Sequence, residues 1–385
     1  MPNIYLDYAA TTPVDERVIS LMRPYFDGLF GNTSSIHTYG QQAESALERS
    51  RETMARIFNC GADEVIFTSC GSESDNLALR GASLASRQQR GANHILISPV
   101  EHHAVSKTAQ QLAELFNFDL EYLPVDQYGC VDPQVVKRYL RKDTALVSII
   151  YANNEIGSIN PIEEIGKICR ERQIPLHTDA VQAAAYLSSD VQKLNIDLMS
   201  VGAHKLYGPK GVGALYVRKG TPMIPVQTGG GQESGLRAGT HNTPYIVGQA
   251  EAFRLAQLEH QARINHILPL RDRVITSILA SVPGARLTGH PSLRLPNHAS
   301  FAFEHVDGNS LLMLLDIAGF ACSSGSACKT GNPEPSDVLS AIGLAHDWAL
   351  GSLRITLGIH TTDEQINMFL DVLPGMISKV RALTT

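Results

Sequence analysis

The chain has 385 residues, 43% of them hydrophobic and 18% charged, which excludes the disordered, collagen-like and miniprotein classes. Its 32 basic and 38 acidic residues give a formal net charge of −6, so the overall charge does not favour nucleic acid or an anionic membrane as a partner. Because residues 1–13 lack the pattern of a secretory signal and no hydrophobic run approaches the roughly 18 residues that cross a bilayer, we expect a soluble, cytoplasmic protein.

Short strand-like segments alternate with longer helical segments as far as residue 217. Strands are expected at 64–69, 94–99, 145–152, 174–180, 197–203 and 213–217, and helices at 72–89, 107–116 and 162–173. Strands that read as continuous apolar runs, each followed by an amphipathic helix, predict a mostly parallel sheet with helices on both faces. The expected fold class is therefore α/β.

A long helical stretch from Tyr245 to Leu279 carries no strand signal, and beyond it the strands and helices follow one another in a different pattern. There we expect a smaller βαβ-like unit, with a strand, a helix and a strand at 299–304, 309–319 and 352–358. A boundary near Leu258 then gives two domains: a large one over 16–258, and a small one made of 1–15 and 259–385.

The six cysteines form no Cys-x-x-Cys pair and no regular framework, so we expect a reducing compartment, no disulfide scaffold and no metal site. Cys328 lies in the small-residue loop 321–336, a composition typical of exposed loops, and the adjacent Lys329 favours its thiolate. Cys328 is the better candidate for a reactive thiol, whereas Cys322 follows an apolar run and is expected to pack.

The segment 201–217 brings His204 and Lys205 from a strand into a glycine-rich turn. A lysine at the end of a buried strand either extends its amine to solvent or has a chemical role. One such role is formation of a Schiff base, because a low-dielectric site lowers the pKa of the amine and frees its lone pair to react with a carbonyl. A surface turn lysine explains this segment equally well. Lys210, in Gly-Pro-Lys-Gly, reads as an exposed turn residue.

Asp179 ends an apolar strand and has no basic neighbour in the sequence. The carboxyl ends of strands in open α/β sheets face the ligand crevice, so a buried carboxylate there needs a cationic partner such as a protonated pyridine nitrogen. Taken alone, the favoured interpretation of Asp179 is a helix N-cap.

Residues 68–76 connect a strand to the start of a helix, where free backbone N–H groups can bind an anion. Gly71 allows the anion to come close to the backbone, and Ser72 lies in the first turn of the helix. A plain capping segment is the alternative. Thr240, in the glycine-rich loop 229–240, is a second candidate phosphate hydroxyl, and Arg237 near it is either structural or an interface residue.

Two further candidates are a histidine pair and an arginine. His102 and His103 are adjacent and cannot face the same direction, so one could stack on a flat cofactor or move a proton, although packed or solvated histidines are commoner. Arg354, on the expected strand 352–358, suits a carboxylate, although surface strand arginines are also common.

These signals are weak individually, but their order along the chain is specific. Together with segments 5–14, 31–40 and 149–157, they resemble the pyridoxal-phosphate-dependent cysteine desulfurases of the class V aminotransferase family, and loop 321–336 resembles the long-loop group of that family. The resemblance covers nearly the whole chain. It implies fold type I, with a large domain built on a mostly parallel sheet and a smaller C-terminal α/β domain.

The resemblance also implies a reaction, in which L-cysteine becomes L-alanine and its sulfur passes to Cys328 as a persulfide. Lys205 would form the Schiff base with pyridoxal 5'-phosphate and then take the substrate Cα proton. His102, stacked on the ring, would be a further proton donor or acceptor. Asp179 would pair with the pyridine nitrogen, and Arg354 would clamp the substrate carboxylate.

The remaining cofactor contacts implied by the resemblance are Asn154 and Gln182 near the phenolic oxygen, and Gly71, Ser72 and His204 at the phosphate. Asn154 is also implied at the substrate. Thr240 would reach the phosphate from the second subunit, which implies a homodimer with shared active sites. The sulfur would go on to an acceptor protein, such as an iron–sulfur scaffold or a sulfur carrier.

Gly202 stands where relatives often carry a serine, and Ser72 where a threonine is commoner, so somewhat lower cofactor affinity is expected. Few residues follow the last expected helix, which leaves the sulfur acceptor open. The alternative enzyme is a lyase of the same superfamily that releases sulfide or selenide without a protein persulfide, and Cys328 discriminates between the two. An aminotransferase would not explain the presence of Cys328. An interaction subunit without a cofactor would not explain Lys205 and Asp179.

Overall fold

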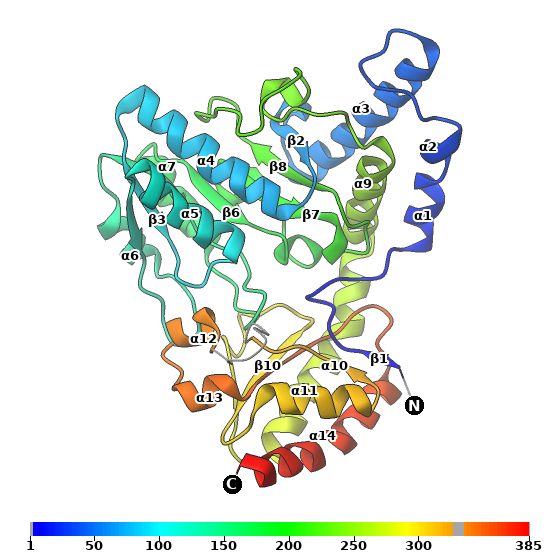
Figure 1. Cartoon of the computed structure of the whole chain (residues 1–385), viewed down its shortest axis with the longest axis vertical. Helices are drawn as coiled ribbons and strands as arrows, with labels where there is room; N and C mark the ends of the chain where they lie inside the picture. Colours follow the sequence, from blue (N-terminus) through cyan, green and yellow to red (C-terminus); the bar gives the residue numbers. More distant parts are fainter. Residues whose placement is uncertain (1–2, 326–334, 385) are drawn as a thin grey trace.

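A computed structural model describes residues 3–325 and 335–384 of the chain (Figure 1). Within these residues the largest sheet has seven strands in the order β2-β8-β7-β6-β5-β3-β4. The strands are β2 (Val65–Thr68), β3 (His94–Ile97), β4 (Asp119–Tyr122), β5 (Thr144–Ser148), β6 (Leu176–Asp179), β7 (Leu198–Gly202) and β8 (Gly213–Val217). β8 runs antiparallel to β2 and β7, and the other pairs are parallel. The prediction of an α/β fold with a mostly parallel sheet is confirmed.

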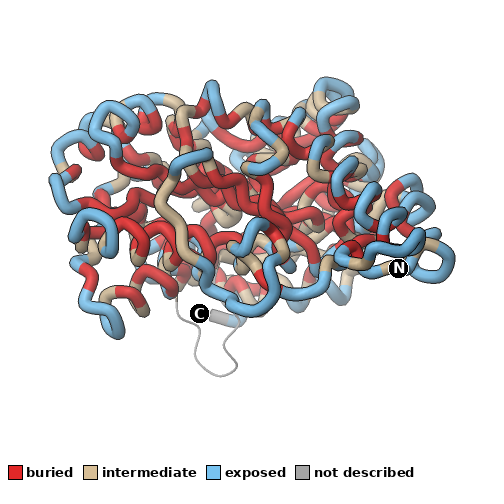
Figure 2. Tube along the Cα trace, turned by 90° about the horizontal axis from the view of Figure 1, so that it is seen from above, coloured by how far each residue is buried: buried red, intermediate tan, exposed pale blue. Residues whose placement is uncertain are grey.

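Helices cover both faces of this sheet, because alternate side chains of a strand point to opposite sides. In β2, Val65 and Phe67 belong to one core cluster and Ile66 to the other. The helices over the first cluster are α3 (Thr38–Phe58), α7 (Ile162–Glu171) and α9 (Thr243–Leu258), and those over the second are α4 (Gly71–Arg90) and α5 (His103–Phe116). Apart from the edge strand β4, the strands are buried along their whole length (Figure 2).

A second sheet of three strands lies in the C-terminal part, in the order β12-β10-β9. Its strands are β9 (Ala285–Leu287), β10 (His298–Phe303) and β12 (Ser352–Thr356). Both pairs are antiparallel, so the predicted βαβ-like arrangement is wrong here. The reason is the connection. After β10 come α11 (Gly308–Ile317), β11 (Phe320–Ala321), α12 (Asp337–Ala341) and α13 (His346–Leu350), and the chain returns to the end of the sheet at which β10 finished, because Ser352 of β12 pairs with Ala302 of β10.

The long helical stretch is two helices, because α9 ends at Leu258 and α10 (His260–Ser281) begins after Glu259. β1 (Ile4–Tyr5) pairs in parallel with β11, which places the N-terminal residues against the C-terminal part of the chain. We therefore keep the proposed division into 16–258 and the combination of 1–15 with 259–385.

The remaining α-helices are α1 (Glu16–Met22), α2 (Pro24–Asp27), α6 (Pro133–Tyr139), α8 (Val191–Leu194) and α14 (Asp363–Thr384). Single 3₁₀ turns occur at Ala62–Glu64, Ala183–Ala185, Ala203–Lys205 and Glu233–Gly235. Among the described residues, no helix combines the length and the hydrophobicity that a membrane crossing requires.

Candidate active site

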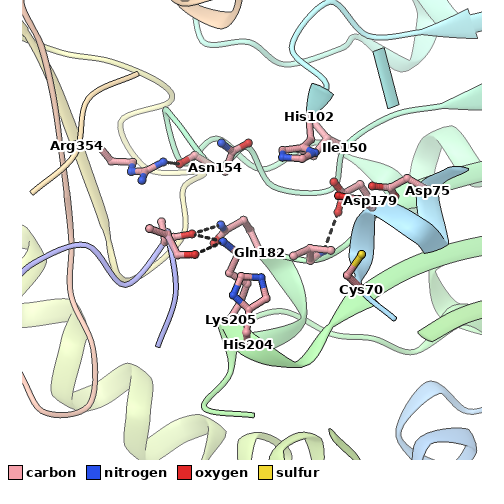
Figure 3. A pocket seen from close by; sticks show the side chains of 15 residues that line it. Cys70, Asp75, His102, Ile150, Asn154, Asp179, Gln182, His204, Lys205 and Arg354 are labelled. Atoms are coloured by element: carbon pink, nitrogen blue, oxygen red, sulfur yellow. Dashed lines mark hydrogen bonds between the residues drawn. The ribbon is translucent and has the colours of Figure 1, made fainter. Parts of the chain in front are cut away.

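The segments that the sequence singled out meet at one cavity of about 290 Å³ (Figure 3). It lies beyond the carboxyl ends of β6 and β7, where ligands bind in open α/β sheets. Nine predicted residues line it: Gly71, Ser72, His102, Asn154, Asp179, Gln182, His204, Lys205 and Arg354. These side chains come from positions scattered between residues 71 and 354, so only the fold brings them together.

The two remaining predicted residues are Thr240, which does not line this cavity, and Cys328. Thr240 is exposed on the loop that precedes α9. Cys328 and its neighbour Lys329 fall within 326–334 and lie outside the described residues. The interpretation of Cys328 as the sulfur acceptor therefore continues to rest on the sequence alone.

Lys205 follows β7 on a single 3₁₀ turn and extends its amine into the cavity. Its Nζ donates hydrogen bonds of 2.6 Å each to the carbonyl oxygens of Ala9 and Ala10. Burial, reinforced by the nearby Arg354 charge, lowers the pKa of this amine to about 8. A usable fraction is therefore unprotonated near neutral pH, as a Schiff-base lysine or a general base requires. Lys210, in contrast, is exposed.

Asp179 is the last residue of β6 and is 5% exposed. Its Oδ1 accepts a 2.9 Å hydrogen bond from the Val181 N–H, a local turn contact. The 3₁₀ turn that follows has Gln182 as its N-cap, so the favoured interpretation of Asp179 as a helix N-cap is wrong. Asp179 lines the cavity. Burial raises the pKa of its carboxyl, and this shift is opposed by His102 when that imidazole is protonated and by the charge of Lys205.

His102 and His103 diverge, as their adjacency predicts. His102 precedes α5 and lies beside the cavity, where its Nδ1 accepts a 3.1 Å hydrogen bond from the Ala104 N–H. That contact orients the ring, and burial lowers the pKa of His102, so its imidazole is neutral at physiological pH. His103 lies away from this cavity and approaches Asp337, with 3.5 Å between Nε2 and Oδ2.

The start of α4 has the features of an anion site. Cys70, its N-cap, makes no side-chain capping hydrogen bond, and the first N–H groups of a helix have no acceptor within the helix. A Cβ atom at Gly71 would lie 2.6 Å from Val181 Cγ2, so a side chain there would crowd the cavity wall. His204 contacts Thr11 Oγ1 through Nδ1 at 3.2 Å, and burial lowers the pKa of His204 to about 4.

Arg354 is buried on β12 and is not the surface strand arginine that the sequence left open. Its Nη2 lies 2.9 Å from Asp7 Oδ1, and its Nη1 donates a 3.1 Å hydrogen bond to the Asn154 carbonyl. Its Nε is buried without a hydrogen-bond partner among the described residues. Asp7 and the Asn154 carbonyl thus orient the guanidinium, and Nη1 and Nη2 each carry a second N–H beyond the one used in these contacts.

Sequence reasoning missed several residues that shape this site. Asp7 orients Arg354, and the Ala9 carbonyl accepts hydrogen bonds from Lys205 and from Gln182 Nε2 at 2.8 Å. Asp75, on α4, is a buried acid beside Asp179. The one available signal for Asp75 was an acidic residue on the buried face of an amphipathic helix.

Arg237 makes a contact of the structural kind, because its Nε pairs with Glu73 Oε1 of the first α4 turn at 2.8 Å. Cys322 packs against the core as expected, and burial raises the pKa of its thiol. Cys70 is exposed and lines the cavity.

Comparisons with known proteins agree with this geometry. The family model for class-V aminotransferases matches residues 4–369. Cysteine desulfurase IscS of Dictyoglomus turgidum is 47% identical over 99% of this chain and 96% of its own length, and cysteine desulfurase IscS of Methanosarcina thermophila is 45% identical over 99% and 93%. A solved NifS-like protein superposes with a TM-score of 0.91, at 35% identity over 98% of this chain and 100% of its own. DndA from Streptomyces lividans gives 0.79, at 35% identity over 92% and 99%.

Proposed function

Because the chain belongs to the class-V aminotransferase family, and within it to the cysteine desulfurases, we propose that it converts L-cysteine to L-alanine and transfers the sulfur to Cys328. The persulfide then supplies sulfur for iron–sulfur cluster assembly or other sulfur-containing cofactors. The observation that carries this proposal is the single cavity that joins Lys205, Asp179, His102 and Arg354.

The cavity fits pyridoxal 5'-phosphate in three respects. The open start of α4 at Gly71 and Ser72 suits the phosphate, with His204 beside it. Asp179 is a buried carboxyl group that calls for a cationic partner, as a pyridine nitrogen provides when protonated. Lys205 supplies the amine for covalent attachment. The remaining contacts proposed for the cofactor come from His102, Asn154, Gln182 and, from a second subunit, Thr240.

When bound, pyridoxal 5'-phosphate supplies an electron sink for the bonds around the substrate Cα. The side chains of the protein bind the substrate, transfer protons and accept the sulfur. Arg354 binds the substrate carboxylate, because it lines the cavity and its Nη1 and Nη2 each carry a second N–H that can donate to a carboxylate. Lys205 takes the Cα proton on Nζ, and neutral His102 accepts or donates a second proton. The Cys328 thiolate then forms an S–S bond with the substrate sulfur while the Cβ–S bond breaks. The electron pair of the broken bond stays with Cβ, and protonation of Cβ gives alanine.

A homodimer is supported by the surface around the loop that carries Thr240. His241 of that loop contacts Thr33 Oγ1 through Nδ1 at 2.8 Å. Near Thr33 in the sequence, Phe30 is 65% exposed and Ile36 is 92% exposed, and a second copy of the chain would cover these apolar side chains. In this arrangement Thr240 extends toward the partner, and the acceptor of the sulfur remains an iron–sulfur scaffold or a sulfur carrier.

The products test the proposed function directly. With L-cysteine, pyridoxal 5'-phosphate and a thiol reductant, we expect L-alanine and sulfide in equal amounts, measured by amino-acid analysis and a sulfide assay. Formation of pyruvate and ammonia in place of alanine would contradict the proposal, because in an elimination the Cβ–S electron pair leaves with sulfide and the remaining aminoacrylate hydrolyses to those products.

Replacing Arg354 by alanine is expected to raise the KM for L-cysteine roughly 100-fold, because each hydrogen bond to a charged group contributes about 1.5–3 kcal/mol. Steady-state kinetics measure this effect. Arg354→Lys keeps the positive charge but lacks the planar guanidinium, so its KM should lie between that of the unsubstituted protein and that of Arg354→Ala. Arg286→Ala is the matched control, since Arg286 lies on β9 and stacks on Trp348. An unchanged KM in Arg354→Ala would remove Arg354 from the substrate site.

A serine at Gly202 is expected to tighten binding of pyridoxal 5'-phosphate roughly 10-fold, the effect of one hydrogen bond to a charged group. A Cβ atom there would lie 3.6 Å from the Gly71 nitrogen, an ordinary contact, so the hydroxyl reaches the anion site without strain. Titration of cofactor-free protein measures the affinity. Gly202→Ala adds the carbon without the hydroxyl, so its affinity for the cofactor should not rise. Equal affinities of Gly202→Ser and Gly202→Ala would refute the expectation.

A further inference from the structure

Beside Asp179 lies a second buried carboxyl group to which the proposed reaction assigns no role. Asp75, in the first turns of α4, is 1% exposed. Asp75, Asp179 and His102 each place one ligand-type atom within 4.8 Å of the others (Figure 3). Asp75 Oδ1 is buried and has no hydrogen-bond partner within the described part of the chain. The two carboxyl groups are therefore held close together, and both are buried.

Two carboxylates at this separation in a buried site do not both ionise, because each loses its hydration and each repels the other. Burial and the neighbouring Asp179 raise the pKa of Asp75, and burial raises the pKa of Asp179. Near neutral pH, one of the two holds a proton.

The surroundings decide which one. Asp179 accepts the Val181 N–H, and the nearby Lys205 charge favours its ionised form. Asp75 Oδ1, in contrast, accepts no hydrogen bond within the described part of the chain. His102 lies within 4.8 Å of both carboxyl groups and is neutral, so it does not discriminate between them. The nearest basic group is His177 on β6, whose Nε2 lies 3.6 Å from Asp75 Oδ1, and burial lowers the pKa of His177 to about 3, so this imidazole is neutral.

The other charged or titratable groups facing Asp75 are Glu101, after β3, and Cys70, before α4, and both oppose its ionisation. The pKa of Glu101 is itself raised to about 8 by burial. The proton of the pair therefore belongs on Asp75.

A chain of neutral groups leads from Asp75 into the sheet. It begins at His177, whose Nε2 lies 3.6 Å from Asp75 Oδ1. Ser200 Oγ lies 2.9 Å from His177 Nε2, and His177 Nδ1 lies 2.8 Å from Ser148 Oγ of β5. All of these side chains are buried, so the network extends across three strands of the sheet without adding charge.

We propose that Asp75 is a positioning residue that carries the proton of the Asp75–Asp179 pair and so leaves the negative charge on Asp179. The assignment of the proton rests on the chain alone. Its use, keeping Asp179 charged opposite the pyridine nitrogen, rests on the proposed function. A neutral Asp75 removes the repulsion that would otherwise place the proton on Asp179.

Infrared spectroscopy tests the location of the proton. Protein labelled with ¹³C at its aspartate carboxyl groups, with and without pyridoxal 5'-phosphate, is compared with Asp75→Asn at pH 7. We expect a label-shifted C=O stretch of a protonated aspartic acid that is lost in Asp75→Asn. Bands from Glu101 do not shift with this label, and Glu101→Gln should leave the aspartate band in place. An aspartate band that persists unchanged in Asp75→Asn would overturn the proposal.

A second measurement tests the charge on Asp179. With ¹⁵N-labelled pyridoxal 5'-phosphate, NMR reports whether the pyridine nitrogen is protonated. We expect it to be protonated in the unsubstituted protein and in Asp75→Asn, whose amide mimics a neutral acid, and to lose the proton in Asp179→Asn. Loss of the proton in Asp75→Asn would show that Asp75 carries the charge. If the protein takes up no cofactor, the proposed function fails, while the infrared comparison still decides where the proton of the pair lies.

Discussion

Lys205→Ala is expected to lower L-alanine formation by about 10⁴-fold or more, because it removes both the attachment point of the cofactor and the base for the Cα proton. The amine is placed for these tasks by two hydrogen bonds to the Ala9 and Ala10 carbonyls, and burial brings its pKa to about 8. Single-turnover assays with excess enzyme measure the loss even when little activity remains.

Lys210→Ala is the matched control, since Lys210 is exposed and does not line the cavity. It should retain the unsubstituted rate, and circular dichroism of both variants checks that they fold. A Lys205→Ala variant that kept the unsubstituted rate would refute the assigned role of this residue.

Cys328→Ala is expected to lower L-alanine formation from L-cysteine by about 10³-fold or more, because no other nucleophile is assigned to the substrate sulfur. Binding of L-cysteine should persist, since Arg354 and Lys205 are unchanged, and a change in the cofactor absorption spectrum reports it. The two effects separate loss of sulfur transfer from loss of the site.

The control for this substitution is Cys130→Ala, which removes a half-buried thiol outside the cavity. Its activity should equal that of the unsubstituted protein. If Cys328→Ala keeps full activity on L-cysteine, a lyase that releases sulfide without a protein persulfide describes the chain better.

The central strands were predictable because they are buried on both faces and therefore read as apolar runs. β4 was not, since its residues Asp119–Tyr122 form a partly exposed edge with the sequence Asp-Leu-Glu-Tyr. The antiparallel pairing of β10 and β12 was missed because pairing direction depends on a long connection whose path the local pattern does not encode.

In the site, single motifs left the roles of Lys205, Asp179 and His102 open, and the family resemblance joined them. Partners from distant segments were beyond local patterns. Asp7 reaches Arg354 across 347 positions, and the Ala9 carbonyl contributes backbone atoms that carry no side-chain signal. Asp75 looked like an ordinary helix residue, and its proposed role depends on Asp179, which lies on the strand β6.

The central claim is that sulfur leaves L-cysteine as a persulfide on Cys328, and peptide mass spectrometry tests it most directly. The purified protein with its cofactor is mixed with L-cysteine without reductant, and the Cys328 peptide and L-alanine are quantified over time. The account predicts that this peptide gains one sulfur as an equal amount of L-alanine appears. Pyruvate or free sulfide forming while Cys328 stays unmodified would contradict it.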